Sequence, residues 1–274
     1  MQYDPIKKSL GKVFNKKPFL RVMFYTLLDL LLLRTWHIKR AIRKNFKNKE
    51  KLPLNALDAG MGFGQYSYYL AKKFPAWKIL GVDVKDEQVA DCNGFFQKIN
   101  LKNAAFEVQD LTKLETENTY DFILSVDVME HILEDDQVFA AFAKAMRKDG
   151  LLLISTPSDK GGSDVHEHEH SESGEHSFIG EHVRDGYNID DIRAQLLRAG
   201  FTKTEAHYNY GTAGKIAWKL SMKYPILMLN ASKLFFVVLP FYYLITYPFC
   251  LILNALDLYG THKTGTGLIV KAWK

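Results

Sequence analysis

A glycine-rich loop preceded by a carboxylate lies early in the chain, at Asp58-Ala-Gly-Met-Gly-Phe-Gly64. Its glycines, Gly60, Gly62 and Gly64, allow the backbone to turn tightly and to approach a ligand at the start of a helix. A dinucleotide-binding G-x-G-x-x-G loop would need its third glycine where this chain has Gln65. An aspartate beside the loop would also repel a pyrophosphate. The pattern therefore predicts a ligand with a cationic amino-acid group.

Two more carboxylates follow the next two strand-like segments. Asp83 ends the apolar run 78–83, and Asp110 comes shortly after the run 104–108. A carboxylate after the second strand can hold both hydroxyls of a ribose, and one after the third can accept a hydrogen bond from an adenine amino group. Taken singly, each acid has an alternative explanation as a helix cap. Three carboxylates at three successive strand ends favour a site for a nucleoside with a cationic tail.

Strand-like and helix-like segments alternate through the middle of the chain, and these segments must position the carboxylates. Strands are expected at residues 54–58, 78–83, 104–108, 120–126, 150–155 and 201–208, and helices at residues 65–74, 86–99, 189–199 and in a segment that ends at residue 148. Alternating units of this size predict an α/β fold with a doubly wound sheet. Ligands of such sheets bind at the carboxyl ends of the strands, where the carboxylates should meet.

Taken in order, these motifs resemble the class I S-adenosylmethionine-dependent methyltransferases. The matching segments are residues 57–64, 81–84, 109–111, 120–132, 149–157, 197–201 and 265–272. The resemblance covers roughly residues 52–209 and 264–274. It implies a seven-stranded Rossmann-like sheet in which residues 264–274 form a last, antiparallel strand.

The resemblance also implies the cofactor S-adenosylmethionine and assigns its contacts. Asp58 and the three glycines would hold the methionine moiety, Asp83 the ribose and Asp110 the adenine. The complete set of expected cofactor residues is Asp58, Gly60, Gly62, Gly64, Gln65, Asp83, Val84, Asp110, Leu111 and Ser125. No metal is assigned to the site.

Methyl transfer from a sulfonium is an in-line displacement, so a base is required only if the acceptor must lose a proton. His182, His131 and Tyr187 are the candidates for a catalytic or acceptor-orienting role. His182 and Tyr187 belong to a segment that resembles the one closing over the acceptor in lipid- and quinone-type members of the family. Ordinary packing is the alternative role for Tyr187.

Two histidine-containing segments raise the question of a metal. His131 ends Asp127-Val-Met-Glu-His131, which resembles the acid-rich, metal-holding stretch of the ubiquinone-pathway O-methyltransferases. A helix-start histidine with capping acids is the favoured alternative. Five of the nine histidines lie within residues 166–182, where they alternate with glutamates. Because that alternation has no fixed ligand spacing, a solvated lid is favoured over a metal site.

Charge is distributed unevenly along the 274-residue chain, whose 36 basic and 31 acidic residues give a net charge of +5. Residues 1–51 contain 14 basic and three acidic residues, a net charge of +11, so the rest of the chain carries −6. The apolar run 19–33 is short for a transmembrane helix, and basic residues follow it. This arm favours an anionic membrane surface over nucleic acid, for which it has no reading module. A core-packing helix with a solvated basic tail is the alternative.

Residues 211–263 form an insertion between the last two expected strands, where the basic fold needs only a short connection. Residues 234–253 contain no charge and are long enough to span a membrane. A single crossing is excluded, because the chain must return to the sheet on the side that it left. The segment 216–231, which contains two lysines and a proline, makes a poor partner for a hairpin.

Pro240 and Pro248 are expected to break this apolar run into short helices. We expect these helices to form a lid or a shallow membrane-dipping surface beside the active site. Tyr242, Tyr243 and Tyr247 suit the boundary between water and lipid. An internal cap over the sheet is the alternative.

These features divide the chain into a basic helical arm (1–51), a cofactor-binding catalytic domain (52–210), the apolar insertion (211–263) and a closing strand (264–274). Cys92 and Cys250 cannot build a disulfide framework, which favours a reducing compartment. We therefore expect a cytoplasmic enzyme, peripherally bound to a membrane, that methylates an oxygen of an apolar or lipid-like acceptor. The alternatives are a soluble methyltransferase of a small aromatic metabolite and a non-catalytic module that partners another enzyme at the membrane. The acceptor's identity, its methylated atom (a carboxylate or an amine is also open) and the oligomeric state stay open.

Overall fold

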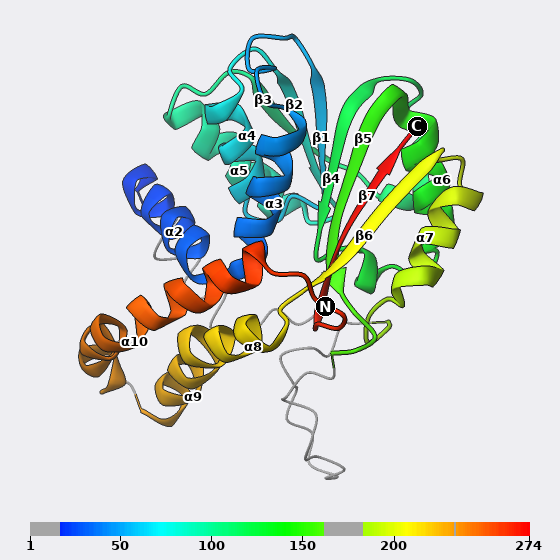
Figure 1. Cartoon of the computed structure of the whole chain (residues 1–274). Helices are drawn as coiled ribbons and strands as arrows, with labels where there is room; N and C mark the ends of the chain where they lie inside the picture. The colour runs from blue at the N-terminus through cyan, green and yellow to red at the C-terminus, as the bar shows by residue number, and fades with distance from the viewer. Residues whose placement is uncertain (1–16, 162–182, 233) are drawn as a thin grey trace, which may run out of the picture.

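The computed structural model describes residues 17–161, 183–232 and 234–274 (Figure 1). Seven strands form one sheet in the order β3-β2-β1-β4-β5-β7-β6. They are β1 (Asn55–Ala59), β2 (Lys78–Asp83), β3 (Ala104–Val108), β4 (Tyr120–Val126), β5 (Met146–Pro157), β6 (Lys203–Asn209) and β7 (Gly267–Trp273). β7 runs antiparallel to β5 and β6, and the other neighbours are parallel. The predicted doubly wound sheet with an antiparallel last strand is confirmed.

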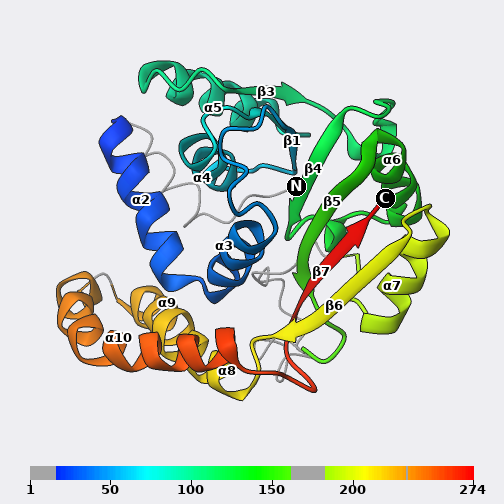
Figure 2. The same cartoon turned by 45° about the horizontal axis from the view of Figure 1, so that its top comes forward.

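Helices cover both faces of this sheet (Figure 2). One face carries α3 (Leu33–Asn45), α4 (Gln65–Lys73) and α5 (Asp86–Lys98), whose buried residues share one apolar core. The other face carries α6 (Asp135–Ala145) and α7 (Ile189–Arg198), which bury a second core. Short turns, η1 (Leu111–Lys113) and η2 (Met129–His131), follow β3 and β4. The sheet is therefore buried on both faces, as parallel strands require.

One predicted boundary is wrong, because the helix before β5 ends earlier than its composition indicates. α6 stops at Ala145, and Met146 already pairs with Tyr120 at the start of β4. The amides of Asn118 and Thr119 donate to the carbonyls of Lys144 and Ala145. These contacts with a neighbouring strand override the helical propensity of Met-Arg-Lys.

The N-terminal arm consists of two helices with different environments. α2 (Pro18–Leu31) is followed by Leu32, whose extended backbone separates it from α3. α3, which contains the first part of the basic stretch, buries Ile38 and Ile42 completely. At the carboxyl end of α3, Arg43 and Lys44 are exposed. The next buried residue, Phe46, packs on the ring of Trp77 and so fixes this end of the helix on the protein. The apolar run and the basic stretch of the arm therefore belong to two separate helices.

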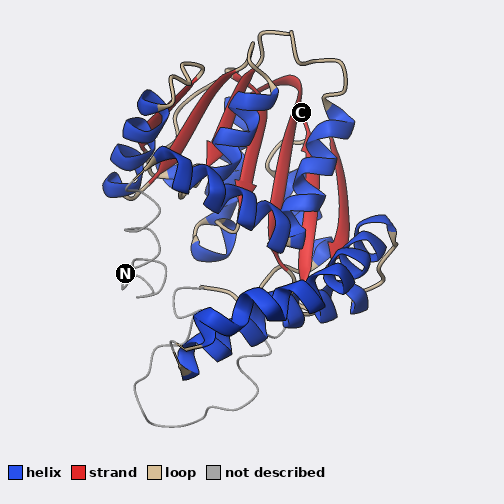
Figure 3. Cartoon of the chain, turned by 90° about the vertical axis from the view of Figure 1, so that its left-hand side faces the viewer, coloured by secondary structure: helices blue, strands red, loops and turns tan. Residues whose placement is uncertain are grey.

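The insertion leaves and rejoins the sheet at the edge where the parallel strands end. α8 (Thr212–Trp218) begins just after β6, and the first residue of β7, Gly267, pairs with Asn209 and Pro157 at the ends of β6 and β5. The π-helical turn η3 (Lys219–Lys223) and α9 (Tyr224–Ala231) extend α8, and α10 (Phe235–Tyr259) returns beside them (Figures 1 and 3). The insertion is thus a helical hairpin across the carboxyl edge of the sheet.

Pro240 and Pro248 do not break the apolar run, contrary to the expectation from sequence. α10 is one helix of 25 residues that contains both prolines. Its hairpin partner holds it in place: the hydroxyls of Tyr242 and Tyr243 donate to the carbonyls of Leu220 and Ser221, each at 2.7 Å. These carbonyls lie in the π-helical turn. Cross-hairpin contacts of this kind hold the helix together across its two missing amide donors.

A buried carboxylate joins α10 to the rest of the protein. Asp257 has no exposed surface and accepts hydrogen bonds from His37 at 3.0 Å and from the amides of Tyr210, Gly211 and Gly214. Burial alone would raise the pKa of Asp257, but the hydrogen bond from His37 and the nearby His262 outweigh it and lower that pKa. Asp257 thus links α10 to α3 and to the start of the insertion.

Asp257→Ala should lower the free energy of unfolding by about 3 kcal/mol, because a histidine and three amides lose one shared acceptor. Thermal denaturation should show a melting temperature several degrees lower. Since folding lowers this pKa, the contribution is present above the unfolded value of about 3.9 and is lost as the pH falls through the folded pKa. An unchanged melting temperature, equal to that of the exposed-site control Asp86→Ala, would contradict this role.

Candidate active site

The glycine loop connects β1 to α4 with backbone angles that glycine favours. Gly60 has a φ of +76°, and a Cβ atom built there would lie 2.3 Å from a methyl group of Val128. Gly64 has a φ of +73° and immediately precedes α4. Both conformations are costly for other residues. The loop therefore presents backbone to the carboxyl edge of the sheet at a helix N-terminus, as predicted.

Asp83, the last residue of β2, lies next to this loop. Its carboxylate accepts the amide of Gly62 at 3.0 Å and the amide of Lys85 at 3.0 Å. The following residue, Val84, is 55% exposed. A half-buried carboxylate with a neighbouring apolar side chain suits the ribose and base of a nucleoside.

Asp58, in β1 just before the loop, is almost completely buried. It is 1% exposed and accepts a hydrogen bond from the Ser67 hydroxyl at 2.6 Å. Burial raises the pKa of Asp58 to about 6, although this hydrogen bond opposes the shift. The carboxylate fixes the start of α4 behind the loop. Ser125 is also fully buried, and its hydroxyl has no partner among the described residues.

Asp110 and His131 line one pocket of about 560 Å³ at the carboxyl edge. Asp110 caps η1, where its carboxylate accepts the amide of Thr112 at 3.0 Å and the hydroxyl of Thr112 at 2.7 Å. Leu111 is buried beneath it. Asp110 therefore does cap a helix, which is the alternative explanation given for this acid. Its carboxylate still lies at the rim of the pocket.

A second polar cluster lies directly after β4. Arg34, from the first turn of α3, forms an ion pair with Asp127. Glu130 is 1% exposed and accepts a hydrogen bond from the Thr156 hydroxyl at 3.1 Å. Burial and the nearby Asp127 charge raise the pKa of Glu130 to about 8. A carboxyl group with such a pKa is mostly protonated at neutral pH, and once deprotonated it is a stronger base than an ordinary carboxylate.

Tyrosine hydroxyls contact the backbone and side chain next to this cluster, and two residues near it have strained backbone angles. The amide of Arg34 donates to the Tyr210 hydroxyl at 3.1 Å, and the next residue, Thr35, bonds the Tyr66 hydroxyl at 3.2 Å. Asp127 and Tyr210 both have left-handed backbone angles, with φ of +51° and +52°. Strained residues of this kind concentrate at functional sites. The Nε of Arg34 is buried and has no partner among the described residues.

The predicted catalytic residues fall in different environments. His131 is exposed beside the pocket. Tyr187 is 4% exposed, and its hydroxyl donates to Asp135 at 2.7 Å, so its contacts are those of a packing residue. His182 and the histidine-rich segment lie outside the described residues. The next residue, Val183, donates its amide to the carbonyl of Glu130 at 3.0 Å.

Metal ligands do not gather in the part of the chain that the structure describes. No group of three or more His, Cys, Asp and Glu side chains there is placed to hold an ion. In the segment that resembles a metal-binding stretch, Asp127 contacts Arg34 and Glu130 contacts Thr156. Both acids thus have protein partners.

The sequence alone does not predict a role for Arg34, Tyr66 or Tyr210, and it indicates Glu130 only as part of an acid-rich stretch. The one feature of the sequence that could have indicated Arg34 is its position directly after the apolar run 19–33. Its contact with Asp127 depends on how the arm packs against the sheet. The position of Glu130 after a buried strand was visible, but its burial was not.

Comparison with known proteins decides the family. A methyltransferase-domain family model matches residues 51–200, more than half of the chain. The chain belongs to the class I S-adenosylmethionine-dependent methyltransferases. S-adenosylmethionine is the cofactor of this family. The positive-φ glycines and the strand-end carboxylates Asp83 and Asp110 fit an amino-acid nucleoside of this kind.

Curated relatives of this methyltransferase differ in the acceptors that they name. (S)-Coclaurine N-methyltransferase of Papaver somniferum is 30% identical over 36% of this chain and 28% of the relative. Malonyl-[acyl-carrier protein] O-methyltransferase of Bacillus cereus is 30% identical over 39% of each chain. Phosphoethanolamine N-methyltransferase 1 of Arabidopsis thaliana is 31% identical over 58% of this chain and 30% of the relative. The matches span less than half of each relative's length.

Solved structures support the same fold. Phosphoethanolamine N-methyltransferase 2 of Haemonchus contortus, in complex with S-adenosyl-L-methionine, aligns with a TM-score of 0.59 and 20% identity over 87% of this methyltransferase and 52% of that chain. A methyltransferase of Mesorhizobium loti aligns with a TM-score of 0.55 and 16% identity over 88% of this methyltransferase and all of that chain. At these identities the likeness concerns the fold alone.

Proposed function

We propose that this protein is a cytoplasmic enzyme that transfers the methyl group of S-adenosylmethionine to an oxygen of an apolar or lipid-like acceptor at a membrane surface. The observation that supports the acceptor class is an exposed apolar layer on α2 and α10, beside the carboxyl edge of the sheet. A soluble enzyme with an internal lid would bury these side chains, and α10 leaves them exposed.

α10 supplies most of this layer. It is the one helix in the described part of the chain that is long and apolar enough to cross a membrane. Its apolar side chains that are at least 60% exposed are Phe236, Val237, Phe241, Leu244, Ile245, Phe249, Ile252, Leu256 and Tyr259. Contiguous exposed apolar surface of this extent marks a protein or membrane contact.

α2 extends the layer, and it buries polar side chains while it exposes apolar ones. Arg21 and Tyr25 are each 2% exposed, whereas Phe19 is 72% exposed and Leu27 and Leu30 are each 41% exposed. A surface helix of a soluble protein shows the opposite arrangement, with its apolar stripe facing the core. The Tyr247 hydroxyl of α10 donates to the Leu30 carbonyl at 2.9 Å, which connects the two helices.

The charges of the insertion suit an anionic lipid surface. Residues 211–256 contain four lysines and no acidic residue. Lys215, Lys219 and Lys223 recur every fourth position along α8 and η3, so they share one side of the helix. Long lysine side chains can bury their stems in an apolar layer and hold their charge among headgroups. These charges favour lipid over an uncharged protein partner.

The anchoring of α10 limits how deeply this layer can enter the bilayer. Cys250, Asn254 and Asp257 are buried against the protein, whereas the part of α10 before Cys250 has no buried residue. That part, residues 235–249, is roughly 22 Å long, less than the roughly 30 Å of a bilayer core. We therefore propose insertion into one leaflet, which would bring the active-site edge to the lipid surface.

Glu130 is the proposed acceptor of the proton that a hydroxyl loses on methylation. S-adenosylmethionine would supply an electrophilic methyl group held on a sulfonium. Glu130 is buried at the carboxyl edge, and Arg34 compensates the charge of the neighbouring Asp127. Methylation of a hydroxyl requires a proton acceptor, whereas methylation of a carboxylate oxygen does not, so this geometry favours a hydroxyl over a carboxylate as the acceptor. His182 stays a second candidate for this role.

Liposome co-sedimentation tests the membrane part of this proposal. Wild-type protein should bind anionic vesicles, and the double substitution Phe241→Asp/Leu244→Asp should weaken partition by about 100-fold or more. Burial of each large side chain contributes about 1.5–3 kcal/mol, and two of them exceed the 2.8 kcal/mol of a 100-fold change. The matched control is Leu52→Asp/Leu197→Asp, at exposed apolar sites outside the layer. Equal partition of both variants, or no binding by wild type, would contradict the proposal.

A further inference from the structure

α2 contacts the cofactor loop directly through its buried polar face. The Arg21 guanidinium donates to the Phe63 carbonyl at 2.8 Å, and the Tyr25 hydroxyl donates to the same carbonyl. Phe63 lies between Gly62 and Gly64, in the middle of the glycine loop. The position of α2 therefore affects the loop that would hold the methionine moiety.

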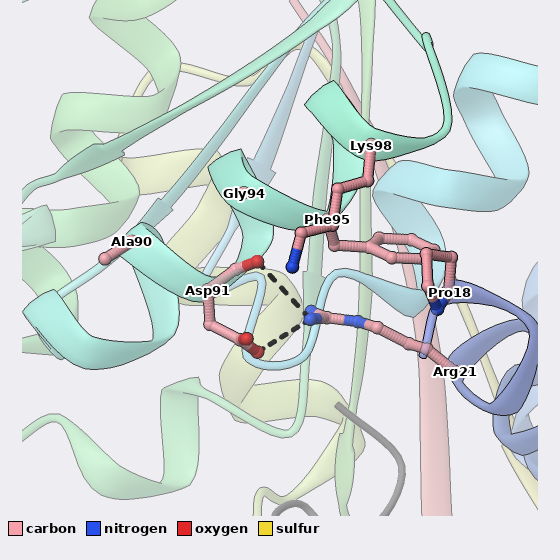
Figure 4. Close-up of a pocket in the computed structure, with 7 residues that line it drawn as sticks. All are labelled: Pro18, Arg21, Ala90, Asp91, Gly94, Phe95 and Lys98. Carbon is pink, nitrogen blue, oxygen red and sulfur yellow. Dashed lines mark hydrogen bonds and ion pairs between the residues drawn. The ribbon is translucent and has the colours of Figure 1, made fainter. Parts of the chain in front are cut away.

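The same arginine also joins α2 to α5. One nitrogen of Arg21 donates to the Asp91 carboxylate at 2.6 Å, and another donates to the Cys92 sulfur at 3.1 Å. Figure 4 shows Arg21 reaching from α2 to Asp91 at a pocket of about 210 Å³ between the two helices. Farther along α2, Asp29 accepts a hydrogen bond from the Gln65 side chain, at the start of α4, at 2.8 Å. α2 is thus docked by polar contacts with elements that flank the cofactor loop.

The opposite side of α2 consists of exposed apolar residues. Phe19, Met23, Leu27 and Leu30 follow helical spacing and form one stripe, which we call the lipid stripe. In water this stripe gains no burial when α2 docks on the loop. On a membrane the docked helix would bury it together with the exposed face of α10. A lipid surface would therefore favour the position of α2 that braces the cofactor loop.

We propose that binding to a lipid surface and binding of S-adenosylmethionine are coupled through α2, an inference that rests on the proposed function. Coupling of two binding sites is reciprocal, so each ligand raises the affinity of the other by the same factor. The expected factor is about tenfold, within the common range of such couplings. The protein would then bind its cofactor most tightly at the membrane.

The experiment is titration calorimetry with S-adenosylmethionine, with and without vesicles of phosphatidylglycerol and phosphatidylcholine. The Kd of the wild-type protein for the cofactor should be about tenfold lower when vesicles are present. Phe19→Ser/Leu27→Ser, which alters only the lipid stripe, should bind the cofactor in water as the wild type does and lose the vesicle effect. Leu52→Ser/Leu197→Ser is the matched control and should keep it.

A second variant tests the polar side of the connection. Arg21→Gln should still bind vesicles through α10, while its Kd for the cofactor should no longer respond to them; circular dichroism checks its fold. Equal cofactor affinity with and without vesicles, in wild-type protein that sediments with them, would overturn the coupling alone. Failure to bind the cofactor, or failure to bind vesicles, would overturn it together with the corresponding part of the proposed function.

Discussion

Asp83→Ala should weaken S-adenosylmethionine binding by about 100-fold or more. A hydrogen bond to a charged acceptor contributes about 1.5–3 kcal/mol, and the variant would lose the two such bonds that we propose Asp83 accepts from the ribose hydroxyls. It also releases the Gly62 amide, which the carboxylate holds at 3.0 Å in the glycine loop. Affinity should therefore fall through both lost contacts and a less ordered loop.

Titration calorimetry measures this loss. Asp86→Ala is the matched control, because Asp86 is an exposed aspartate in the first turn of α5, three residues farther along. It should bind the cofactor as the wild type does. Circular dichroism confirms that both variants are folded. A Kd for Asp83→Ala within threefold of the wild-type value would remove Asp83 from the cofactor site.

Glu130→Gln should lower turnover by about 10²- to 10⁴-fold, the usual contribution of a positioned acid or base, with little change in cofactor affinity. Glutamine has the same shape and can still accept the hydrogen bond from Thr156, so packing is preserved. It cannot accept the proton of an acceptor hydroxyl. The loss should therefore appear in kcat.

The pH dependence of the wild-type protein provides a second readout of the same residue. Burial and Asp127 raise the pKa of Glu130 to about 8, and a base acts in its deprotonated form. The value of kcat/KM should therefore rise as the pH increases through about 8, and this rise should be missing in Glu130→Gln. Glu115→Gln, at an exposed glutamate, is the control. Normal turnover in Glu130→Gln together with loss in His182→Ala would assign proton transfer to the histidine instead.

The sheet and the glycine loop could be predicted from the sequence, because each of their elements is indicated by residues that are close together in the chain. Each parallel strand is a short apolar run, and Asp83 and Asp110 follow their strands at positions that any parallel sheet brings to one edge. The glycine loop has a spacing that itself dictates a turn before a helix. These features need no knowledge of distant contacts.

The elements that we propose serve the acceptor and the membrane depend on contacts between distant parts of the chain. Arg34 meets Asp127 only because α3 packs along the sheet, and the orientation of α2 follows from Arg21 and its partners on α5. The local rule that proline breaks a helix gave a wrong prediction at Pro240 and Pro248, because hairpin contacts keep α10 continuous. The sequence likewise could not predict that α2 buries Arg21 and Tyr25 and exposes its apolar side chains, because the partners of Arg21 lie on other helices.

Methyl transfer into membrane lipid extract is the most direct test of the whole account. The protein is incubated with methyl-labelled S-adenosylmethionine and vesicles made from a total lipid extract, and the organic phase is then analysed. We expect label in an apolar product, formed by the wild type and by Asp86→Ala but not by Asp83→Ala. Label that stays in water-soluble products, or no transfer by a wild-type protein that binds both cofactor and vesicles, would contradict it.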